Sequence, residues 1–510
     1  MGMGIFMPQP VFADEAGDES AGEAVVEAVA EPIMDADEAA LFELINSARR
    51  DPLGTAESLG MDREKILNDF PEYNDILING MPELEFDEHL YQSSGEHTSD
   101  MLANNYYAYE SIDGRTPAQR MNDAGYVASV SGETLGLMFF NNFINSDQAV
   151  FHLFANMYKD ELDPEWTGQR NILNPDVNDI GVSISGGLFQ FNKKFSGNVY
   201  MLTCDFGTDV EPYELELLQM INQARANPRA VAQYYGIDVE AVLNAMPELE
   251  SLFSSKALPP LAFNAHLYAA AQDHVLDMFE NGYYARNSLD GRTPAMRFRE
   301  NGYEPFWAGE SRARLSTCYT QKSPAETVTK IFKQMVLNAF RLQGWRDQTM
   351  FSADAVETGI RVIAGESKAL SGICGDNIHL TVADYSAPVL YAGPALTGMV
   401  YCDVNENSLF DVGEGLPDVV VTIKKSDTAA AVSNVAANTA GGFSTDLSPG
   451  RYRISISTSI STDLSDETQV QWVTIDEDDV NKWVTFKIQP YNLVSDEIVA
   501  SDTTEGLTNL

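Results

Sequence analysis

An internal repeat limits what this chain can fold into more than any other feature of its sequence. Residues 41–52 (LFELINSARRDP) return as residues 217–228 (LLQMINQARANP), and the apolar positions follow helical spacing in both copies. Residues 86–91 (FDEHLY) return in the same way as residues 263–268 (FNAHLY). Because the interval between the paired segments is almost constant, the sequence predicts two successive copies of one module.

Capping and turn residues repeat together with the helices. Asp87 and Asn264 precede the second predicted helix of each copy, and both side chains are good N-caps. The string DGRTPA occurs at 113–118 and again at 290–295. Its Asp-Gly pair predicts a turn, and its Thr-Pro pair predicts the cap and the first turn of another helix.

Helical segments come first in each copy, and β-type runs come last, at 199–206 and 378–385. This order favours α+β packing over a parallel βαβ fold. At about 150 residues per domain, a chain of 510 residues is expected to form three domains. The predicted divisions are a signal-peptide remnant with an acidic leader (1–36), the two modules (37–209 and 210–390), a β-rich domain (395–490) and a polar tail (491–510).

The charge of the chain is strongly negative, with 76 acidic against 32 basic residues and a net charge of −44. Such a surface repels phosphate backbones, so we exclude nucleic acid as a partner. No run of about 18 or more apolar residues occurs, so we predict no transmembrane segment. Residues 11–13 (VFA), followed by Asp14, fit the cleavage site of a secretory signal and predict export. The basic start of such a signal is missing, so we expect the true leader to begin further upstream.

The four cysteines are too few for a disulfide scaffold, and they lack the spacing of metal ligands. Several pairings among Cys204, Cys318, Cys374 and Cys402 are open. Cys318 and Cys374 are the only two that fall in one predicted domain, so we favour a bridge between them.

Together, the repeated strings resemble the CAP superfamily, which contains the cysteine-rich secretory, antigen 5 and plant pathogenesis-related proteins and their bacterial secreted relatives. The resemblance rests on Tyr-Tyr-Ala before Ser-x-Asp-Gly-Arg-Thr-Pro, and on Gly-Tyr followed by Gly-Glu, in both copies. It implies an α-β-α sandwich for each module. It also implies a surface cleft that gathers two histidines and two acidic residues and sometimes holds a divalent metal.

Both family histidines are missing from the matching positions of this chain. The first falls at Tyr109 in one copy and at Arg286 in the other. The second falls at Gly168 or Gln169 in the first copy, where the gap is ambiguous, and at Trp345 in the second. Without imidazoles, the clefts have neither the usual zinc ligands nor a base that works at neutral pH. We therefore expect degenerate clefts.

The acidic residue of the family is retained in both copies, as Glu133 and Glu310. Two interpretations stay open, because each carboxylate either lines a cleft or caps a turn. If the clefts persist, we expect a salt bridge between Arg286 and Glu310. In the first copy we expect a hydrogen bond between Tyr109 and Glu133.

Four of the six histidines recur as pairs, His89 with His266 and His97 with His274. His97 and His274 lie on the apolar faces of predicted helices. We therefore expect these two side chains to be buried and hydrogen-bonded rather than to bind a metal.

The β-rich domain begins with a loop that matches the twelve-residue calcium loop of an EF-hand. Counting Asp403 as the first position, the ligand positions hold Asp403, Asn405, Asn407, Leu409 (through its carbonyl), Asp411 and Glu414. Flanking helices are absent, and the segment instead resembles the prealbumin-like β-sandwich repeats of bacterial surface proteins, which carry such a loop between their first strands. We expect calcium as the cofactor, and a polar turn without a metal is the alternative.

No nucleophile elbow, zinc-protease, phosphate-loop or dinucleotide motif occurs in the chain. We expect a secreted or cell-surface, non-catalytic binding or adhesive protein. Two alternatives stay open: a divergent extracellular hydrolase or protease that uses Glu133 or Glu310, and a structural spacer of a surface layer or matrix. The family resemblance suggests a lipid, a small apolar ligand or a cell-wall component as the partner, and no residue selects among them.

Overall fold

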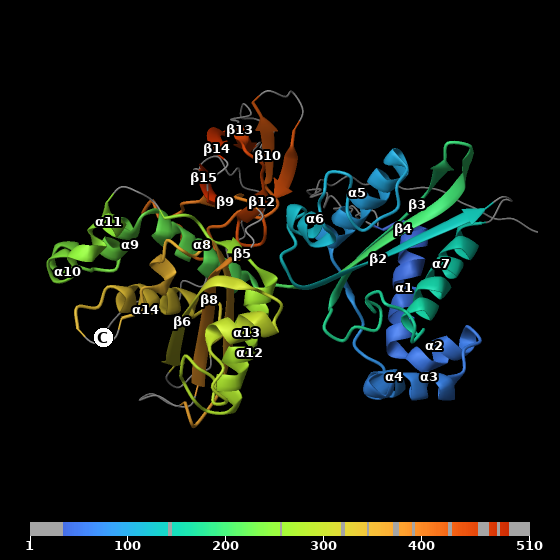
Figure 1. The fold of residues 1–510 in the computed structure, drawn as a ribbon, viewed down its shortest axis with the longest axis horizontal. Helices are drawn as coiled ribbons and strands as arrows, with labels where there is room; N and C mark the ends of the chain where they lie inside the picture. Colours follow the sequence, from blue (N-terminus) through green and yellow to red (C-terminus); the bar gives the residue numbers. More distant parts are fainter. Residues whose placement is uncertain are drawn as a thin grey trace, which may run out of the picture.

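The structure is a computed structural model that describes the chain between residues 34 and 488, with internal gaps (Figure 1). The described residues are 34–140, 145–254, 258–317, 322–343, 346–370, 377–389, 393–426, 431–456, 469–476 and 480–488. The predicted signal cleavage site, the favoured pair Cys318 and Cys374, Trp345 and the polar tail lie outside them. Cys204 and Cys402 are both buried free thiols.

The first module begins with a helix that is capped at its start. α1 (Ala36–Arg50) follows Asp35, whose side chain accepts from the backbone of Glu38 while the Glu38 side chain accepts from Asp35 in return. The helix therefore begins before the repeated string does. The other helices are α2 (Pro52–Ser58), α3 (Arg63–Asp69), η1 (Pro71–Tyr73), α4 (Asn74–Asn79), α5 (Glu88–Asn104), α6 (Pro117–Asp123) and α7 (Ser146–Glu161).

Four strands of the first module form one sheet in the order β1-β3-β4-β2. They are β1 (Glu85–Phe86), β2 (Ala128–Phe140), β3 (Asp179–Asn192) and β4 (Phe195–Asp209). Because side chains alternate between the faces of a strand, Val182 and Cys204 join α1 and α7 in the main core. Their neighbours face α5, where the Thr98 hydroxyl donates to the Thr203 hydroxyl at 2.9 Å. The module is a three-layer α-β-α sandwich.

The second module repeats this order of elements. Its helices are α8 (Pro212–Ala226), α9 (Pro228–Tyr234), α10 (Val239–Ala245), η2 (Pro247–Leu249), α11 (Glu250–Phe253), α12 (Ala265–Glu280), α13 (Pro294–Glu300), α14 (Val328–Ala339) and η3 (Thr349–Phe351). Its strands are β5 (Ala262–Phe263), β6 (Pro305–Thr317), β7 (Glu357–Glu366) and β8 (Asn377–Pro388), in the order β5-β7-β8-β6. Asn264 caps α12 as Asp87 caps α5, each accepting from two backbone N–H groups. The predicted α+β class is confirmed.

The remaining described residues form a β-domain of two sheets around one hydrophobic core. Its strands are β9 (Ala395–Cys402), β10 (Val420–Lys425), β11 (Ser433–Ala436), β12 (Gly442–Asp446), β13 (Gly450–Ile456), β14 (Gln469–Ile475) and β15 (Lys482–Ile488). One sheet has the order β11-β10-β13-β14, and the other has the order β12-β9-β15. In the second sheet β9 pairs antiparallel with β12 and parallel with β15.

The β-domain lies between the two modules and contacts both (Figure 1). On the first module, His89 Nε2 lies 2.8 Å from Asp418 Oδ1, across the domain boundary. On the second, the Asn481 side chain donates to the carbonyl of Val356 at 2.7 Å. A small apolar cluster joins all three parts and contains Val127, Val210, Leu215, Tyr268 and Ala440. Among the described helices, none has the length and apolar character that a membrane crossing requires.

Candidate functional site

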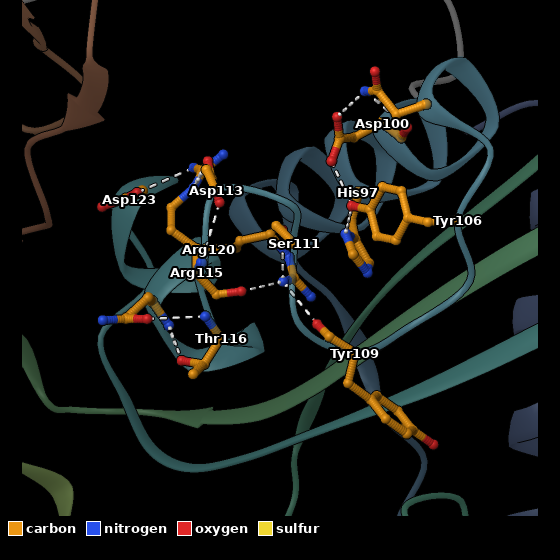
Figure 2. A network of polar contacts seen from close by, with 12 residues as sticks. His97, Asp100, Tyr106, Tyr109, Ser111, Asp113, Arg115, Thr116, Arg120 and Asp123 are labelled. Carbon is orange, nitrogen blue, oxygen red and sulfur yellow. Dashed lines mark hydrogen bonds and ion pairs between the residues drawn. The ribbon is translucent and has the colours of Figure 1, made fainter.

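The first candidate cleft lies beside a loop that connects α5 to α6 (Figure 2). The loop closes where Ser111 donates its backbone N–H to the carbonyl of Arg115 at 2.9 Å. Gly114 has a φ of 91°, which a glycine adopts without strain. Thr116 then caps α6, and Pro117 takes its first position. These local features direct the first turns of α6 toward β2.

Arg120, on α6, is the centre of a buried polar network. Its Nη1 donates to the carbonyl of Tyr109 at 2.9 Å and to the Ser111 hydroxyl at 3.0 Å. Its Nη2 donates to Glu133 Oε2 at 2.5 Å. Asp205 lies directly opposite Glu133 on the neighbouring strand β4, and it is fully buried. The Arg120 guanidinium group therefore binds one carboxyl group of a buried pair.

His97, on α5, completes this network from the other side. Its Nε2 donates to the carbonyl of Ala108 at 3.0 Å and lies 3.8 Å from Glu133 Oε1. Burial and the positive charge of Arg120 lower the pKa of His97 to about 4, so the imidazole is neutral at neutral pH. The prediction of a buried, hydrogen-bonded histidine is confirmed.

Burial also dominates the titration of the two carboxyl groups. It raises the pKa of Glu133, and the nearby Asp205 raises it further. Burial likewise raises the pKa of Asp205. Because Arg120 supplies only one positive charge, burial of the two carboxyl groups favours the retention of a proton by the pair.

The second module contains the same network, built from His274, Arg297, Glu310 and Asp384. Arg297 Nη2 donates to Glu310 Oε2, and Asp384 lies opposite Glu310 on β8. His274 Nε2 donates to the carbonyl of Ala285 at 3.0 Å. Burial raises the pKa of Glu310 to about 7, against the effect of Arg297, and it lowers the pKa of His274 to about 4. The network thus recurs in both modules.

A pocket of about 430 Å³ opens above the network in the first module. It is lined by Tyr109, Thr116, Pro117, Ala118, Ser131, Gly132, Glu133, Thr167, Gly168 and Gln169. Three positions that the sequence marked, Tyr109, Glu133 and Gln169, therefore meet in one cavity. The Tyr109 side chain is 48% exposed, but that of Glu133 is only 1% exposed. The pocket offers hydroxyl groups, an amide and an aromatic ring, with its carboxylate recessed beneath.

The corresponding surface of the second module carries positive charge. The guanidinium groups of Arg312 and Arg314 lie 5.1 Å and 5.4 Å from the centre of the Tyr284 ring. Arg312 Nε also lies 2.9 Å from Glu310 Oε1. Beside them, a side chain at Gly309 would collide with the Trp307 ring, so that ring lies directly over the strand. The two clefts have therefore diverged in charge and in shape.

The loop between Asp403 and Glu414 is folded around its own carboxylates. Asp403 accepts from the backbone N–H groups of Asn407 and Ser408, and Glu414 accepts from those of Val404 and Asp411. The side chains of Asn405 and Asn407 donate to Asp411 Oδ2 at 2.8 Å and 2.7 Å. Leu409 donates its backbone N–H to the Asn407 side chain. All six predicted ligand residues thus belong to one compact loop.

This loop provides the oxygen donors that calcium prefers, and a cation already lies against it. The Lys487 ammonium group, on β15, contacts Asp403 Oδ2, and the Asp403 side chain is fully buried. The amide nitrogens of Asn405 and Asn407 both donate to Asp411. No three carboxyl, imidazole or thiol groups form a ready metal cluster within the described residues. The donor set fits calcium, provided that the two amides turn their oxygens inward and Lys487 withdraws.

Comparison with known proteins identifies the two modules. A model of the family described as "CAP: Cysteine-rich secretory protein family" matches residues 42–206 and, separately, residues 218–345. The chain belongs to the CAP family. No curated protein matches the chain.

Several solved structures are similar to parts of this CAP protein. An extracellular protein containing an SCP domain from Bacillus anthracis is 17% identical, with a TM-score of 0.18, over 29% of this chain and 40% of its own. An outer surface protein from Borrelia burgdorferi is 19% identical, with a TM-score of 0.20, over 34% of this chain and 93% of its own. A 5-hydroxyisourate hydrolase from Klebsiella pneumoniae is 16% identical, with a TM-score of 0.14, over 19% of this chain and 90% of its own. The chain thus spans less than half the length of the Bacillus anthracis protein.

Two predicted contacts in the CAP clefts are wrong. Tyr109 meets the network through its carbonyl, and its ring points away from Arg120 (Figure 2). Arg286 likewise contributes its carbonyl, which accepts from Arg297 at 3.2 Å. Within the described residues, Arg120 and Arg297 take the places beside Glu133 and Glu310 that we assigned to Tyr109 and Arg286. A residue from the following helix reaches the buried carboxylate, which the exposed loop residue does not.

The buried network around Arg120 and Arg297 was not predicted from the sequence, although the repeat contains its residues. Arg120 and Arg297 recur at the same interval as the other repeated residues, and each lies three positions after the proline of the DGRTPA string. Asp205 and Asp384 also recur, near the end of each module. The recurrence marked these charged residues as common to both modules, but it did not show which residues they contact.

Proposed function

We propose that this CAP protein is an exported binding protein whose first cleft holds a neutral, hydroxyl-bearing ligand, such as a segment of a surface glycan, without catalysis. The observation that supports the proposal most directly is that the Glu133 carboxylate is buried beneath the pocket. Among the described residues that line the pocket, Glu133 is the only carboxylic acid, and it is paired with Arg120 beneath the surface. What remains accessible is the Tyr109 ring together with hydroxyl and amide groups. Such groups stack on and hydrogen-bond to a ligand without moving a proton.

Calorimetric titration with soluble cell-wall glycan fragments tests this proposal. Removing the ring by Tyr109→Ala should weaken binding about tenfold, since aromatic contacts contribute about 0.5–1.5 kcal/mol beyond buried area. Tyr107→Ala is the matched control, because Tyr107 is also exposed but does not line the pocket. Equal affinities of the two variants for the glycan would show that the ligand does not bind in this cleft.

The alternative of a hydrolase is tested on the same protein. A raised pKa makes Glu133 a potential proton donor, which is a feature of many catalytic carboxyl groups. If the wild-type chain cleaves a peptide, ester or glycan panel and Glu133→Gln abolishes the cleavage, the cleft is catalytic. The absence of turnover by the wild-type chain, together with glycan binding, supports the binding function. The absence of both leaves the structural spacer as the favoured alternative.

We also propose that the loop between Asp403 and Glu414 binds one calcium ion. Asp403, Asn405, Asn407, Asp411 and Glu414 would hold the ion through side-chain oxygens, and Leu409 through its carbonyl. The support is the nature of the donors and the buried state of Asp403, which already holds the ammonium group of Lys487. The ion would supply positive charge to the loop carboxylates and stabilise the start of the β-domain.

Melting curves of the full chain with calcium and with chelator test the site. At free calcium ten times the dissociation constant, binding should add about 1.4 kcal/mol of stability. Glu414→Gln should abolish the shift. Glu406→Gln, in the same loop but outside the ligand positions, should leave it intact. Identical shifts in the two variants would place any calcium elsewhere.

Export forms part of the proposal, and it is supported by the small-residue sequence before Asp14 and by the description of the family as secretory. N-terminal sequencing of the protein from its native source should begin near Asp14. A protein that keeps residues 1–13 would contradict this.

A further inference from the structure

The tip of the first sheet exposes a group of large apolar side chains. The hairpin of β3 and β4 turns at Lys193 and Lys194, and Phe191 and Phe195 flank this turn. Phe191 is 38% exposed and Phe195 is 45% exposed, and their ring centres lie 5.4 Å apart. Exposed apolar side chains that lie together in this way on a folded protein mark a contact site.

The exposed rings are held in place by packing rather than left free. Phe139, at the end of β2, lies edge-on to Phe191 at 5.5 Å and to Phe195 at 5.4 Å between ring centres. A side chain at Gly197 would fall 2.1 Å from the Phe139 ring, so this glycine allows the ring to lie across β4. Beneath them Phe189 is buried against the core below α5. The tip is therefore a preformed surface.

The charge of the tip is opposite to that of the whole chain. No acidic residue occurs from Ile180 to Cys204, although 76 of the 510 residues are acidic. Lys193 and Lys194 are the only charged residues in that segment. The tip thus combines aromatic rings with two positive charges.

The second module provides an internal comparison, because its strands β7 and β8 pair with each other as β3 and β4 do in the first module. Residues 363–380 contain no phenylalanine, tyrosine or tryptophan and include Glu366, Lys368 and Asp376. The aromatic, acid-free tip is therefore specific to the first module and is not a requirement of the sandwich. Figure 1 shows that the β3–β4 hairpin projects away from the second module and the β-domain.

We propose that the tip of the β3–β4 hairpin inserts into the surface of an anionic lipid bilayer. Phenylalanine side chains bury themselves at the boundary between lipid headgroups and acyl chains, and lysines beside them attract anionic headgroups. The acidic remainder of the protein does not prevent this contact, since charges further away than about 8 Å are largely screened at physiological salt. α5 ends beside Gln190, whose backbone N–H donates to the Asn105 side chain, so the turn at Lys193 and Lys194 lies beyond the end of that helix.

Co-sedimentation of the full chain with phosphatidylcholine vesicles, with and without phosphatidylglycerol, tests the proposal. The wild-type chain should bind the anionic vesicles more strongly. The double variant Phe191→Ser/Phe195→Ser should lose at least about tenfold in partition coefficient, because burial of a phenylalanine contributes about 1.5–3 kcal/mol. Phe306→Ser is the matched control, because Phe306 is 78% exposed on the second module.

A second pair of variants separates charge from apolar contact. Lys193→Glu/Lys194→Glu should remove the preference for phosphatidylglycerol, with an unchanged melting temperature to show that the chain still folds. Equal partition of the wild-type chain, the Phe191→Ser/Phe195→Ser variant and the control would overturn the proposal. So would concentration-dependent self-association in sedimentation velocity that the same double variant abolishes, since that result would assign the tip to a second copy of the chain.

Discussion

Arg120 and Arg297 hold the buried carboxylate of each module through a short, nearly solvent-free contact. Removing charges from water costs several kcal/mol per ion, and only a well-placed partner offsets that cost. Glu133 and Glu310 each have such a partner on the helix that begins at Pro117 or Pro294. The Thr116 side chain caps the first of these helices and the Thr293 side chain makes no cap hydrogen bond in the second, so the arginine contact does not depend on the cap.

We predict that Arg120→Ala lowers the free energy of unfolding by about 3–5 kcal/mol, because it leaves Glu133 and Asp205 buried without a positive charge. Urea denaturation measures this loss. Arg50→Ala is the control: Arg50 also contacts two carboxylates, Glu43 and Glu83, but it does so at the surface. We expect no measurable loss there, and comparable losses for the two variants would contradict the buried ion pair.

Single residues show how far the sequence could lead. The caps at Asp87, Asn264 and Thr116 were predictable, because a cap is defined by neighbours within one turn. The burial of His97 and His274 was predictable from helical spacing. The residue that pairs with Glu133 was not predictable, because residues on different elements meet only after the sheet and helix have packed. The recurrence of Arg120 as Arg297 made it a candidate for a shared role, but it did not identify Glu133 as its partner.

At the scale of elements, the loop after β9 depends on a strand that lies far away in sequence. Lys487, on β15, reaches Asp403 because β15 runs parallel to β9 and brings its last residues beside Tyr401 and Cys402. The sequence of the loop indicated six ligand positions, but it gave no sign of the lysine that lies against the first of them. That contact exists only once the two strands have paired.

We predict that Lys487→Gln strengthens calcium binding about fivefold, since a unit charge about 4 Å away costs about 1 kcal/mol in water. Calorimetry on the full chain measures the affinity. Lys482→Gln, at the far end of the same strand, makes the same change in charge and should leave the affinity unchanged. Weaker binding by the Lys487 variant would mean that this lysine supports the loop rather than competes with the ion.

At the scale of the whole molecule, the β-domain joins two modules that share a fold. His89 connects it to the first module and lies 2.8 Å from Asp418 and 3.7 Å from Asp87. Asp87, and then Asp418, raise the pKa of His89 to about 9 against the opposing effect of burial. His266 occupies the same place in the second module, but the β-domain approaches that module elsewhere, through Asn481. This asymmetry could not be predicted, because a repeat in sequence carries no information on where a third domain docks.

We predict that the stability of the chain falls between pH 7 and pH 9. A histidine whose pKa is higher in the folded state stabilises the folded chain fully below its ordinary pKa of about 6.5. This contribution is lost as the pH rises through the pKa of the folded state, which is about 9 for His89. Burial raises the pKa of Asp209 to about 7. The folded chain therefore keeps a proton on this group below pH 7 that the unfolded chain releases, so stability also falls as the pH rises toward 7. Urea midpoints at a series of pH values measure the slope. His89→Gln should flatten it, whereas His266→Gln should not, and equal slopes in all three proteins would contradict the role of His89.

The pairing of β9 with β15 has a mechanical consequence. These are the first and last described strands of the β-domain, and they run side by side in the same direction from Leu396 opposite Lys482 to Cys402 opposite Ile488. A pull between the second module and the end of β15 acts along both strands in opposite senses, so it loads every hydrogen bond of the ladder at once. Antiparallel neighbours pulled from adjacent ends would instead open one bond at a time. The β-domain is therefore built to withstand tension along the chain, and single-molecule stretching should show it yielding at a higher force than β-domains whose terminal strands unzip.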